Sequence, residues 1–93
     1  MPALVRAACA GDARAFEGIM RQHNRLLFRT ARGIVPDDAQ AQDVVQETYL
    51  QAFVHLKSFR GEAQLGTWLA RIAIRIALAM QRQRGRLVQL EDG

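Results

Sequence analysis

Four arginines and a tryptophan near the C-terminus have the types and the spacing that could bind a nucleic acid. In a helix that turns about 100° per residue, all five side chains fall on one side, with the arginines within roughly 60° of one another. They are Trp68, Arg71, Arg75, Arg82 and Arg86. Guanidinium groups bind phosphates, and an indole ring offers a surface for an unstacked base. The alternative is that the arginines are merely solvated and that Trp68 belongs to the core.

A second group of side chains, in the middle of the chain, could bind a protein. Its members combine acids with aliphatic residues and share an arc of about 100° on a predicted helix. They are Asp43, Gln46, Glu47, Leu50 and Val54. A polar rim around an apolar centre is typical of a protein-docking surface. The alternative is an ordinary surface helix with two stray aliphatic residues.

No arrangement of residues for catalysis is visible in the sequence. His23 and His55 stand far apart, and Cys9 has no evident base beside it. No Cys, Asp or Glu stands at a metal-ligand spacing from His23, which is interpreted as a satisfied core or boundary residue. The loop FRGEAQLG lacks the lysine and the preceding strand of a phosphate-binding loop. We therefore expect a protein that is not an enzyme and that binds no metal or cofactor.

The elements that must position these residues are predicted to be helices. Helix formers dominate and turn formers are sparse, which argues for an all-α fold of three main helices and a short N-terminal one. Asp12 is expected to cap the second helix, and Asp37 with Gln40 forms a capping box for the third. Thr67 is expected to cap the last helix, which Gly85 ends. The predicted helices cover residues 3–10, 12–34, 37–57 and 67–85.

Apolar residues at helical spacing predict the packed sides of the helices. The helix over 12–34 buries Phe16, Ile19, Met20, Leu27, Ala31 and Ile34. The helix over 37–57 buries Val45, Tyr49, Ala52, Phe53 and Leu56. The last helix buries Leu69, Ile72, Ala73, Ile76 and Met80. In the loop before it, Phe59 and Leu65 either tuck into the core or wall a pocket.

Charge is divided along the chain into three blocks. The net charge is +4, the pI is about 10.6, and twelve of the thirteen cations are arginine. Residues 1–35 carry a net charge of +4, residues 36–56 of −4 and residues 57–90 of +6. Excess arginine favours phosphate and base contacts, and two basic blocks around an acidic one predict two different partners.

Length and composition predict one small cytoplasmic domain. Residues 1–86 are assigned to the domain and residues 87–93 to the start of a linker or a disordered tail. The single Cys9 rules out an internal disulfide and fits a reducing compartment, and its Ala-rich setting predicts a buried small residue. No apolar run approaches the roughly 18 residues of a membrane span, and the N-terminus lacks a signal-peptide pattern.

Three stretches of the sequence together carry a family resemblance. They are GDARAF at 11–16, DVVQETYLQAF at 43–53 and FRGEAQLGTWLARIA at 59–73. Their order and spacing resemble region 2 of the sigma-70 family of bacterial transcription initiation factors, and most closely the extracytoplasmic-function (ECF) group. The resemblance spans residues 4 to about 86, nearly all of the chain.

The resemblance implies a compact helical domain that serves RNA polymerase in the bacterial cytoplasm. In the family, the DVVQE helix docks on the clamp helices of the β′ subunit, which implies a docking role for Gln42, Asp43, Gln46, Glu47 and Leu50. The loop and helix that follow recognise the promoter −10 element as single-stranded non-template DNA and help to melt the duplex. That role is implied for Phe59, Arg60, Gly61, Glu62, Ala63, Gln64, Leu65, Trp68, Arg71, Arg75 and Arg82. Phe59 would lie against a flipped base, and Trp68 would support the loop.

The chain departs from the family pattern at three points. Arg75 stands where the family usually has an Asn that helps to read the flipped base, and an arginine offers donors only. Gln42 replaces the usual Glu beside Asp43 and removes one charge from the docking face. The family's helix-turn-helix domain, which reads the −35 element, does not follow residue 86.

Two rival hypotheses accompany the sigma interpretation. One keeps the fold but not the DNA: a helical module that binds only a protein, such as an anti-sigma regulator, which the Arg75 departure favours. The other is a basic amphipathic helix over 68–86 that lies on membranes, which leaves the acidic helix unexplained.

Overall fold

Three long helices make up most of the structure. The computed structural model describes residues 6–8, 10–59 and 64–92, with side chains up to residue 85. The helices are α2 (Ala13–Arg32), α3 (Asp38–His55) and α4 (Leu65–Asp92), with the short 3-10 helix η1 (Leu56–Ser58) after α3. Residues 6–8 are helical as well, and the described ranges hold no strand. The predicted all-α fold, with three main helices and a short N-terminal one, is confirmed.

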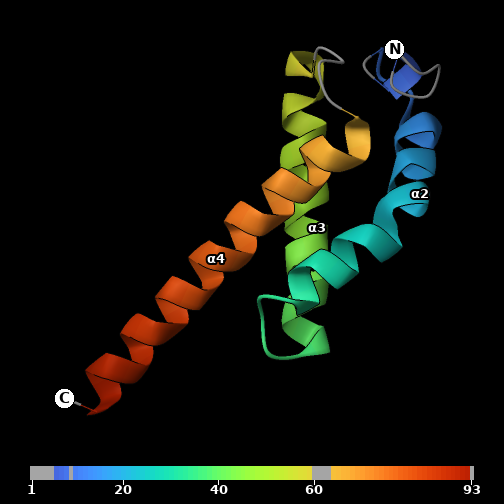
Figure 1. Cartoon of the computed structure of the whole chain (residues 1–93). Coiled ribbons are helices and arrows are strands. Elements are labelled where there is room, and N and C mark those ends of the chain that lie inside the picture. The colour runs from blue at the N-terminus through green and yellow to red at the C-terminus, as the bar shows by residue number, and fades with distance from the viewer. Residues whose placement is uncertain (1–5, 9, 60–63, 93) are drawn as a thin grey trace.

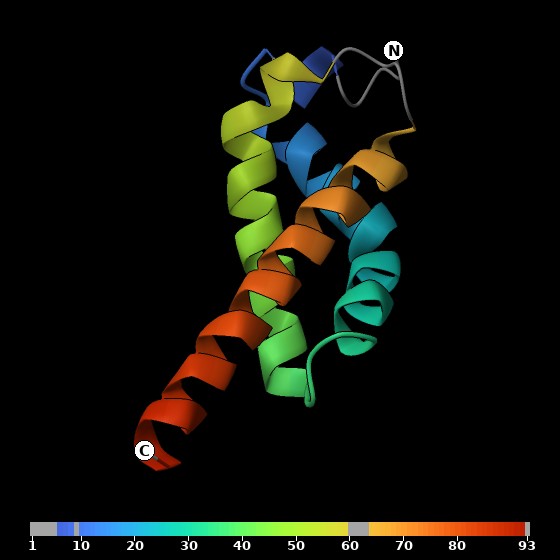
Figure 2. The ribbon, with the colours of Figure 1, turned by 60° about the vertical axis from the view of Figure 1, so that its left-hand side comes forward.

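The three helices pack around a single crossing. Helices α2 and α3 run in opposite directions beside each other, and α4 crosses them obliquely (Figure 1). The second view shows the same crossing, and the C-terminal part of α4 extends beyond the other helices (Figure 2). The molecule is therefore elongated, with extents of 52 × 22 × 21 Å. Each helix contributes an almost inaccessible side chain to the core, namely Leu27, Val44 and Leu69.

Aspartates begin α2 and α3 where the sequence predicts. The Asp12 carboxylate accepts hydrogen bonds from two backbone N–H groups of the first turn of α2, at 3.0 and 3.2 Å. The Asp37 carboxylate accepts one from the backbone N–H of Gln40 at 2.8 Å, which holds the pKa of Asp37 below its ordinary value. Gly11, with a φ of 98°, ends the preceding turn in a conformation that a side chain would resist. The caps predicted for α2 and α3 are confirmed.

Helix α4 begins earlier than predicted. It starts at Leu65, so Thr67 lies within the first turn and is not the cap. A Cβ added at Gly66 would lie 3.3 Å from the side chains of His23 and Leu26. The bare glycine thus lets this first turn pack closely against α2, a tertiary contact that the sequence pattern does not reveal.

Helix α4 also ends later than predicted, because it continues through Gly85 to Asp92. A glycine inside a helix costs only about 1 kcal/mol relative to alanine, and its Arg, Gln and Leu neighbours are good helix formers. No proline follows it, so nothing forces the helix to stop. The prediction that Gly85 ends the helix is wrong, whereas the assignment of residues 87–93 to a linker stays a prediction.

Helix α3 is buried along a wider arc than predicted, because it packs against α2 and α4 at once. The buried members of the predicted stripe are Tyr49, Ala52 and Leu56, and Val45 is half-buried. Val44 and Thr48 are buried too, and the Thr48 hydroxyl donates to the Val44 carbonyl at 2.7 Å. Phe53 is 57% exposed, so its predicted burial is wrong. The Phe53 ring contacts the Phe16 ring edge-on, with centroids 5.2 Å apart.

The other predicted stripes lie in or against the core. Fully buried members are Ile19, Leu27, Ala31, Leu69, Ile72 and Ala73, and partly buried ones are Phe16, Met20, Ile34, Ile76 and Met80. His23 is half-buried with its Nδ1 2.7 Å from the Ile19 carbonyl oxygen, which confirms it as a satisfied boundary residue. The expected burial of Cys9 lies outside the described residues.

Tyr49 ties α3 to the middle of α2. Its hydroxyl donates to the Met20 carbonyl oxygen at 2.7 Å and lies 2.8 Å from Oδ1 of Asn24. Figure 1 shows that α2 bends along its length. A side chain that donates a hydrogen bond to a helix carbonyl, as Tyr49 does to Met20, is one cause of such bends. Burial of the phenol raises the pKa of Tyr49 to about 12.

We expect the variant Tyr49→Phe to lose less stability than the wild-type protein when the pH is raised into the alkaline range. The folded state favours the neutral phenol, so the contribution of Tyr49 is complete below its ordinary pKa of 10.0 and is lost as the pH rises to about 12. Urea unfolding of both proteins at about pH 9 and about pH 12 measures this. The variant should be less stable by about 1 kcal/mol at the lower pH, because the hydrogen bond is gone. An equal decline with pH in both proteins would contradict the assignment.

Candidate nucleic-acid and protein interfaces

The basic face of α4 is exposed as the sequence predicts. We use this name for Arg71, Arg75 and Arg82 with Trp68 beside them. The three arginines are exposed and make no ion pair within the described part of the chain, whereas Trp68 is half-buried. The Arg86 side chain lies outside the described residues. Four positive or aromatic groups are therefore available together to an external ligand.

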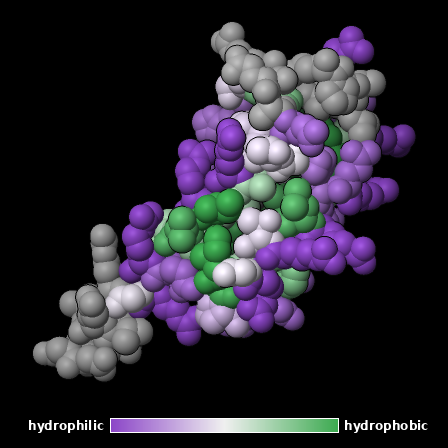
Figure 3. Space-filling model, in the orientation of Figure 1, coloured by the Kyte–Doolittle hydropathy of each residue, from purple (hydrophilic) through white to green (hydrophobic). Residues whose placement is uncertain are grey.

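Two hollows flank the pair formed by Trp68 and Arg75. One, of about 270 Å³, is lined by Gln51, His55, Ser58, Trp68, Ile72 and Arg75. The other, of about 510 Å³, is lined by Trp68, Arg71, Ile74 and Arg75. Figure 3 shows hydrophobic atoms gathered along the middle of the molecule, where α4 crosses it, among hydrophilic ones. The indole and the guanidinium thus separate two recesses, each of which combines polar and apolar walls.

Gln51 and His55, together with Ser58 of η1, line the smaller hollow, although the sequence analysis gave them no binding role. Gln51 and His55 come from α3, although the predicted DNA-binding residues all lie between Phe59 and Arg82. Their only signal is a four-residue spacing that places them on one side of a helix. The side of α3 that packs against α4 depends on the tertiary structure. The spacing alone therefore does not predict that these residues line a hollow.

Phe59 belongs to the core, which decides between the two positions that the sequence leaves open for it. It is 6% exposed, and its ring centroid lies 5.2 Å from that of Trp68. Leu65 is half-buried against the core, and Gln64 is exposed. The accessible aromatic surface at this end of α4 therefore belongs to Trp68. The remaining predicted loop residues, Arg60, Gly61, Glu62 and Ala63, lie outside the described residues.

The acidic face of α3 has the predicted composition and exposure. We use this name for Asp43, Gln46, Glu47, Leu50 and Val54. Leu50 is 64% and Val54 71% exposed, although both are aliphatic. Asp43 has no ion pair in the described structure, and Glu47 accepts only a 3.3 Å hydrogen bond from Gln51. Gln42 is exposed beside this face. The arrangement is an uncompensated acidic rim around an apolar centre.

Two further classes of site, a metal centre and a membrane-spanning helix, have no counterpart in the described part of the chain. No three His, Cys, Asp or Glu side chains there lie together as metal ligands. None of its helices combines the length and the apolar character that crossing a membrane requires.

The sequence and the fold are similar to those of known transcription factors. The profile of a family described as "Sigma-70 region 2" matches residues 19–87. The chain is 37% identical over 83 residues to the RNA polymerase sigma-H factor of Pseudomonas aeruginosa, covering 89% of this chain and 43% of that protein. It is 36% identical over 91 residues to the ECF RNA polymerase sigma-E factor of Haemophilus influenzae, covering 97% and 47%. The chain thus spans less than half the length of these relatives.

A solved structure shares the fold. It is the NMR structure of an engineered region 2 of sigmaE in complex with GTAAAA, with a TM-score of 0.82 and 31% identity. The match covers 89% of this chain and 86% of that one. Both the order of the helices and their packing are therefore common to the two molecules.

We expect Phe59→Ala to destabilise the fold and the exposed arginines to be dispensable for it. Removing a buried phenyl ring should lower the free energy of unfolding by about 3–5 kcal/mol, and Phe59→Leu by less than about 1.5 kcal/mol. The double variant Arg71→Gln, Arg75→Gln should change it by less than about 0.5 kcal/mol, because both side chains are solvated. Urea unfolding measures all three. A cost below about 1 kcal/mol for Phe59→Ala would contradict the core position of the ring.

Proposed function

The chain belongs to the Sigma-70 region 2 family, and we propose that it is the part of a bacterial transcription initiation factor that docks on core RNA polymerase and engages the promoter −10 element. Its sigma-factor relatives are not enzymes. The observation that carries the proposal is the separation of an acidic–apolar face on α3 from a basic–aromatic face on α4. Two faces of opposite chemistry suit two partners, one protein and one nucleic acid. We place this activity in the bacterial cytoplasm, with the polymerase.

The acidic face of α3 is the proposed polymerase-docking surface. Exposed aliphatic side chains at its centre supply area to bury, and the acids at its rim select a basic partner. Within the described residues, Asp43 and Glu47 pair with no cation, so no cation found there competes with those of a partner. This fits docking on the β′ clamp helices, the partner that the family resemblance implies.

The basic face of α4 is the proposed DNA surface. Arg71 and Arg75 would hold phosphates, and the accessible side of Trp68 would stack against an unpaired base. Opening a base step costs a few kcal/mol, of which stacking returns about 1–3 kcal/mol per base. The structural relative in complex with GTAAAA supports this assignment.

The position of Phe59 modifies the proposed mode of base recognition. A ring that is 6% exposed cannot stack on a base without leaving the core. We therefore assign the stacking surface to Trp68. Phe59 would support the indole ring from the core, with an angle of 44° between the planes of the two rings. Arg75 stands between the two hollows and offers only donors, so it favours acceptor atoms such as phosphate oxygens or base carbonyls.

We expect the double variant Asp43→Arg, Glu47→Arg to abolish binding to a purified β′ clamp-helix fragment. Reversing both charges replaces attraction to a basic partner by repulsion, which costs several kcal/mol across an interface. Calorimetric titration of both proteins with the fragment measures it. The matched control Glu17→Arg, Asp38→Arg makes the same change in charge at exposed sites and should bind like wild type.

That control also guards against a trivial loss of binding. Glu17 and Asp38 each lose a surface ion pair at 3.0 Å, which contributes about 0–1 kcal/mol to folding. Asp38 also loses its interaction with the N-terminal end of the α3 dipole, about 0.3–1 kcal/mol. No binding by the folded wild-type domain would contradict the docking role. Equal losses in both double variants would show that only net charge matters.

We expect Arg71→Gln, Arg75→Gln to weaken binding of the single strand GTAAAA and to flatten its dependence on salt. Each lost phosphate contact should lower the slope of log K against log salt by about 0.7. Fluorescence anisotropy at several salt concentrations measures both effects. The matched control Arg14→Gln, Arg21→Gln removes the same charge from α2 and should keep the wild-type slope.

The same experiment separates the DNA reader from the protein-binding module. Saturable clamp-helix binding by a wild-type domain that shows no affinity for the single strand, alone or with polymerase, would favour the module. If the slope of log K against log salt falls equally in the α4 and the α2 arginine variants, the assignment of the DNA surface to α4 is contradicted.

A further inference from the structure

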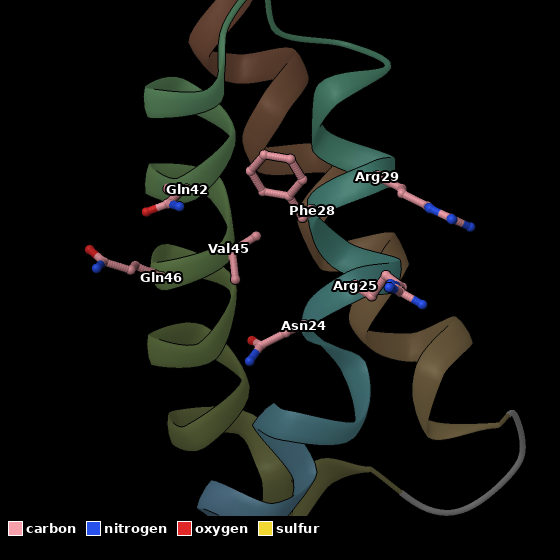
Figure 4. A pocket seen from close by; sticks show the side chains of 7 residues that line it. All are labelled: Asn24, Arg25, Phe28, Arg29, Gln42, Val45 and Gln46. Carbon is pink, nitrogen blue, oxygen red and sulfur yellow. The ribbon is translucent and has the colours of Figure 1, made fainter.

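The groove between α2 and α3 continues the proposed polymerase-docking surface. It encloses about 780 Å³, and Phe28 and Val45 lie between its two helices (Figure 4). Arg25 and Arg29 line it from α2, and Gln42 and Gln46 line it from α3. Both glutamines belong to the docking surface, so a protein bound there covers this edge of α3. At the opposite edge of α3, the acidic face meets the basic face of α4.

The two faces border the same hollow, the recess of about 270 Å³ between α3 and α4. From α3 it is lined by Gln51, whose amide donates a 3.3 Å hydrogen bond to Glu47 of the acidic face. From α4 it is lined by Trp68 and Arg75 of the basic face. Two surfaces of opposite charge therefore adjoin each other on one side of the molecule.

The basic face of α4 has exposed aliphatic side chains beside it, as the acidic face of α3 has at its centre. Ile74 is 38% and Leu78 46% exposed. At about 100° per residue, both share an arc of about 100° with Arg71, Arg75 and Arg82. Phosphate contacts by arginines and stacking of a base on Trp68 make no use of these two aliphatic side chains.

The two faces are complementary in charge. Within the described residues, Asp43 and Glu47 pair with no cation, and the arginines of the basic face pair with no carboxylate. No ion pair in that part of the chain joins one face to the other. Opposite charges around apolar centres are the pattern of two surfaces that fit each other. Because the faces do not neutralise each other within one chain, a second copy offers each of them a matching surface.

Symmetry determines how two copies fit together. Most homo-oligomers are dimers with a two-fold axis, in which the same surface of both copies forms the contact. An axis that runs along the boundary between the faces places each acidic face on the basic face of the other copy. An axis across that boundary would place like charges together, which is unfavourable. The charge pattern therefore selects the first arrangement, which closes as a dimer.

The net charge of the chain opposes association at long range only. Each copy carries +4. Charges more than about 8 Å apart are largely screened at physiological salt, whereas groups in contact are screened much less. Two helix faces from each copy make a small interface, below about 1,200 Å², which is the class of transient contacts. We therefore expect a weak and reversible dimer.

We propose that two copies of this chain associate through the acidic face of α3 in each and the basic face of α4 in the other. The contact itself follows from the charges and the exposed aliphatic side chains of the two faces. Its consequence rests on the proposed function: each copy covers the polymerase-docking and the DNA surface of the other. The dimer is thus an autoinhibited form, from which core polymerase and promoter DNA release the monomer by competing for the same faces.

Sedimentation velocity of the wild-type chain tests the association. Between about 10 μM and about 1 mM protein, the sedimentation coefficient should rise towards that of a dimer and no further. The rise should be present at about 0.1 M salt and lost at about 1 M salt, where the Debye length falls to about 3 Å. A chain that stays monomeric at the highest concentration, or that assembles beyond the dimer, would overturn the proposal.

Charge reversal assigns the contact to the two faces. The variants Asp43→Arg, Glu47→Arg and Arg75→Glu, Arg82→Glu should each self-associate at least about tenfold more weakly than wild type. An equimolar mixture of the two should recover the wild-type affinity, because each reversed face then meets a reversed partner. All four side chains are exposed and unpaired in the described structure, so both variants should keep the helical circular dichroism of wild type.

A matched mixture controls for net charge. The variant Arg25→Glu, Arg29→Glu changes the charge of the chain by the same amount on α2, away from both faces. Mixed with Asp43→Arg, Glu47→Arg, it should associate at least about tenfold more weakly than the complementary pair does. No recovery in the complementary mixture, or equal recovery in both mixtures, would contradict the contact between α3 and α4.

The β′ clamp-helix fragment separates this inference from the proposed function. Added to the dimer, the fragment should return the sedimentation coefficient to that of a one-to-one complex with the monomer. A dimer that forms while the fragment fails to bind would leave the self-association standing and contradict the docking role. Fragment that binds without dissociating the dimer would contradict the masking of the acidic face.

Discussion

The burial of α3 against two helices at once is the constraint on which the surfaces of this domain depend. Val44 and Thr48 are inaccessible together with Tyr49 and Ala52, so only one arc of α3 remains exposed. That arc carries Asp43, Gln46, Glu47, Leu50 and Val54. The groove against α2 follows one edge of the arc, and the hollow under Trp68 and Arg75 follows the other. The packing of one helix therefore sets the position of the acidic face and of the hollows along its two edges.

Electrostatics divides the arginines of this basic chain into two classes. Arg21 and Arg32 are paired with carboxylates on the surface, where such pairs contribute little to stability. Arg25, Arg29, Arg71 and Arg75 are exposed without a carboxylate within the described residues. Unpaired cations at the edge of a recess retain their capacity to bind an external anion. The total charge of +4 thus says less about partners than the locations where the charge is left uncompensated.

The contact between Phe59 and Trp68 links the core to the basic face of α4. Phe59 is held in the core, and its ring supports the indole at a centroid distance of 5.2 Å. The close approach of Gly66 to His23 and Leu26 fixes the first turn of α4 in the same region. A preorganised aromatic surface loses less conformational entropy on binding than a mobile one. Core packing and the proposed DNA contacts are therefore coupled at this end of the helix.

The sequence by itself determined the class of fold, the caps at Asp12 and Asp37, and the membership of the two exposed faces. These features depend on local chemistry: a carboxylate bonds to the N–H groups of its own turn, and helical periodicity places residues on a common side. The start of α4, the exposure of Phe53 and the burial of Phe59 were decided by tertiary structure. So were the groove at Arg25 and Arg29 and the roles of Gln51 and His55 as walls of a hollow. Each of these depends on which helices meet and at what angle, and periodicity within one helix contains no information about its neighbours.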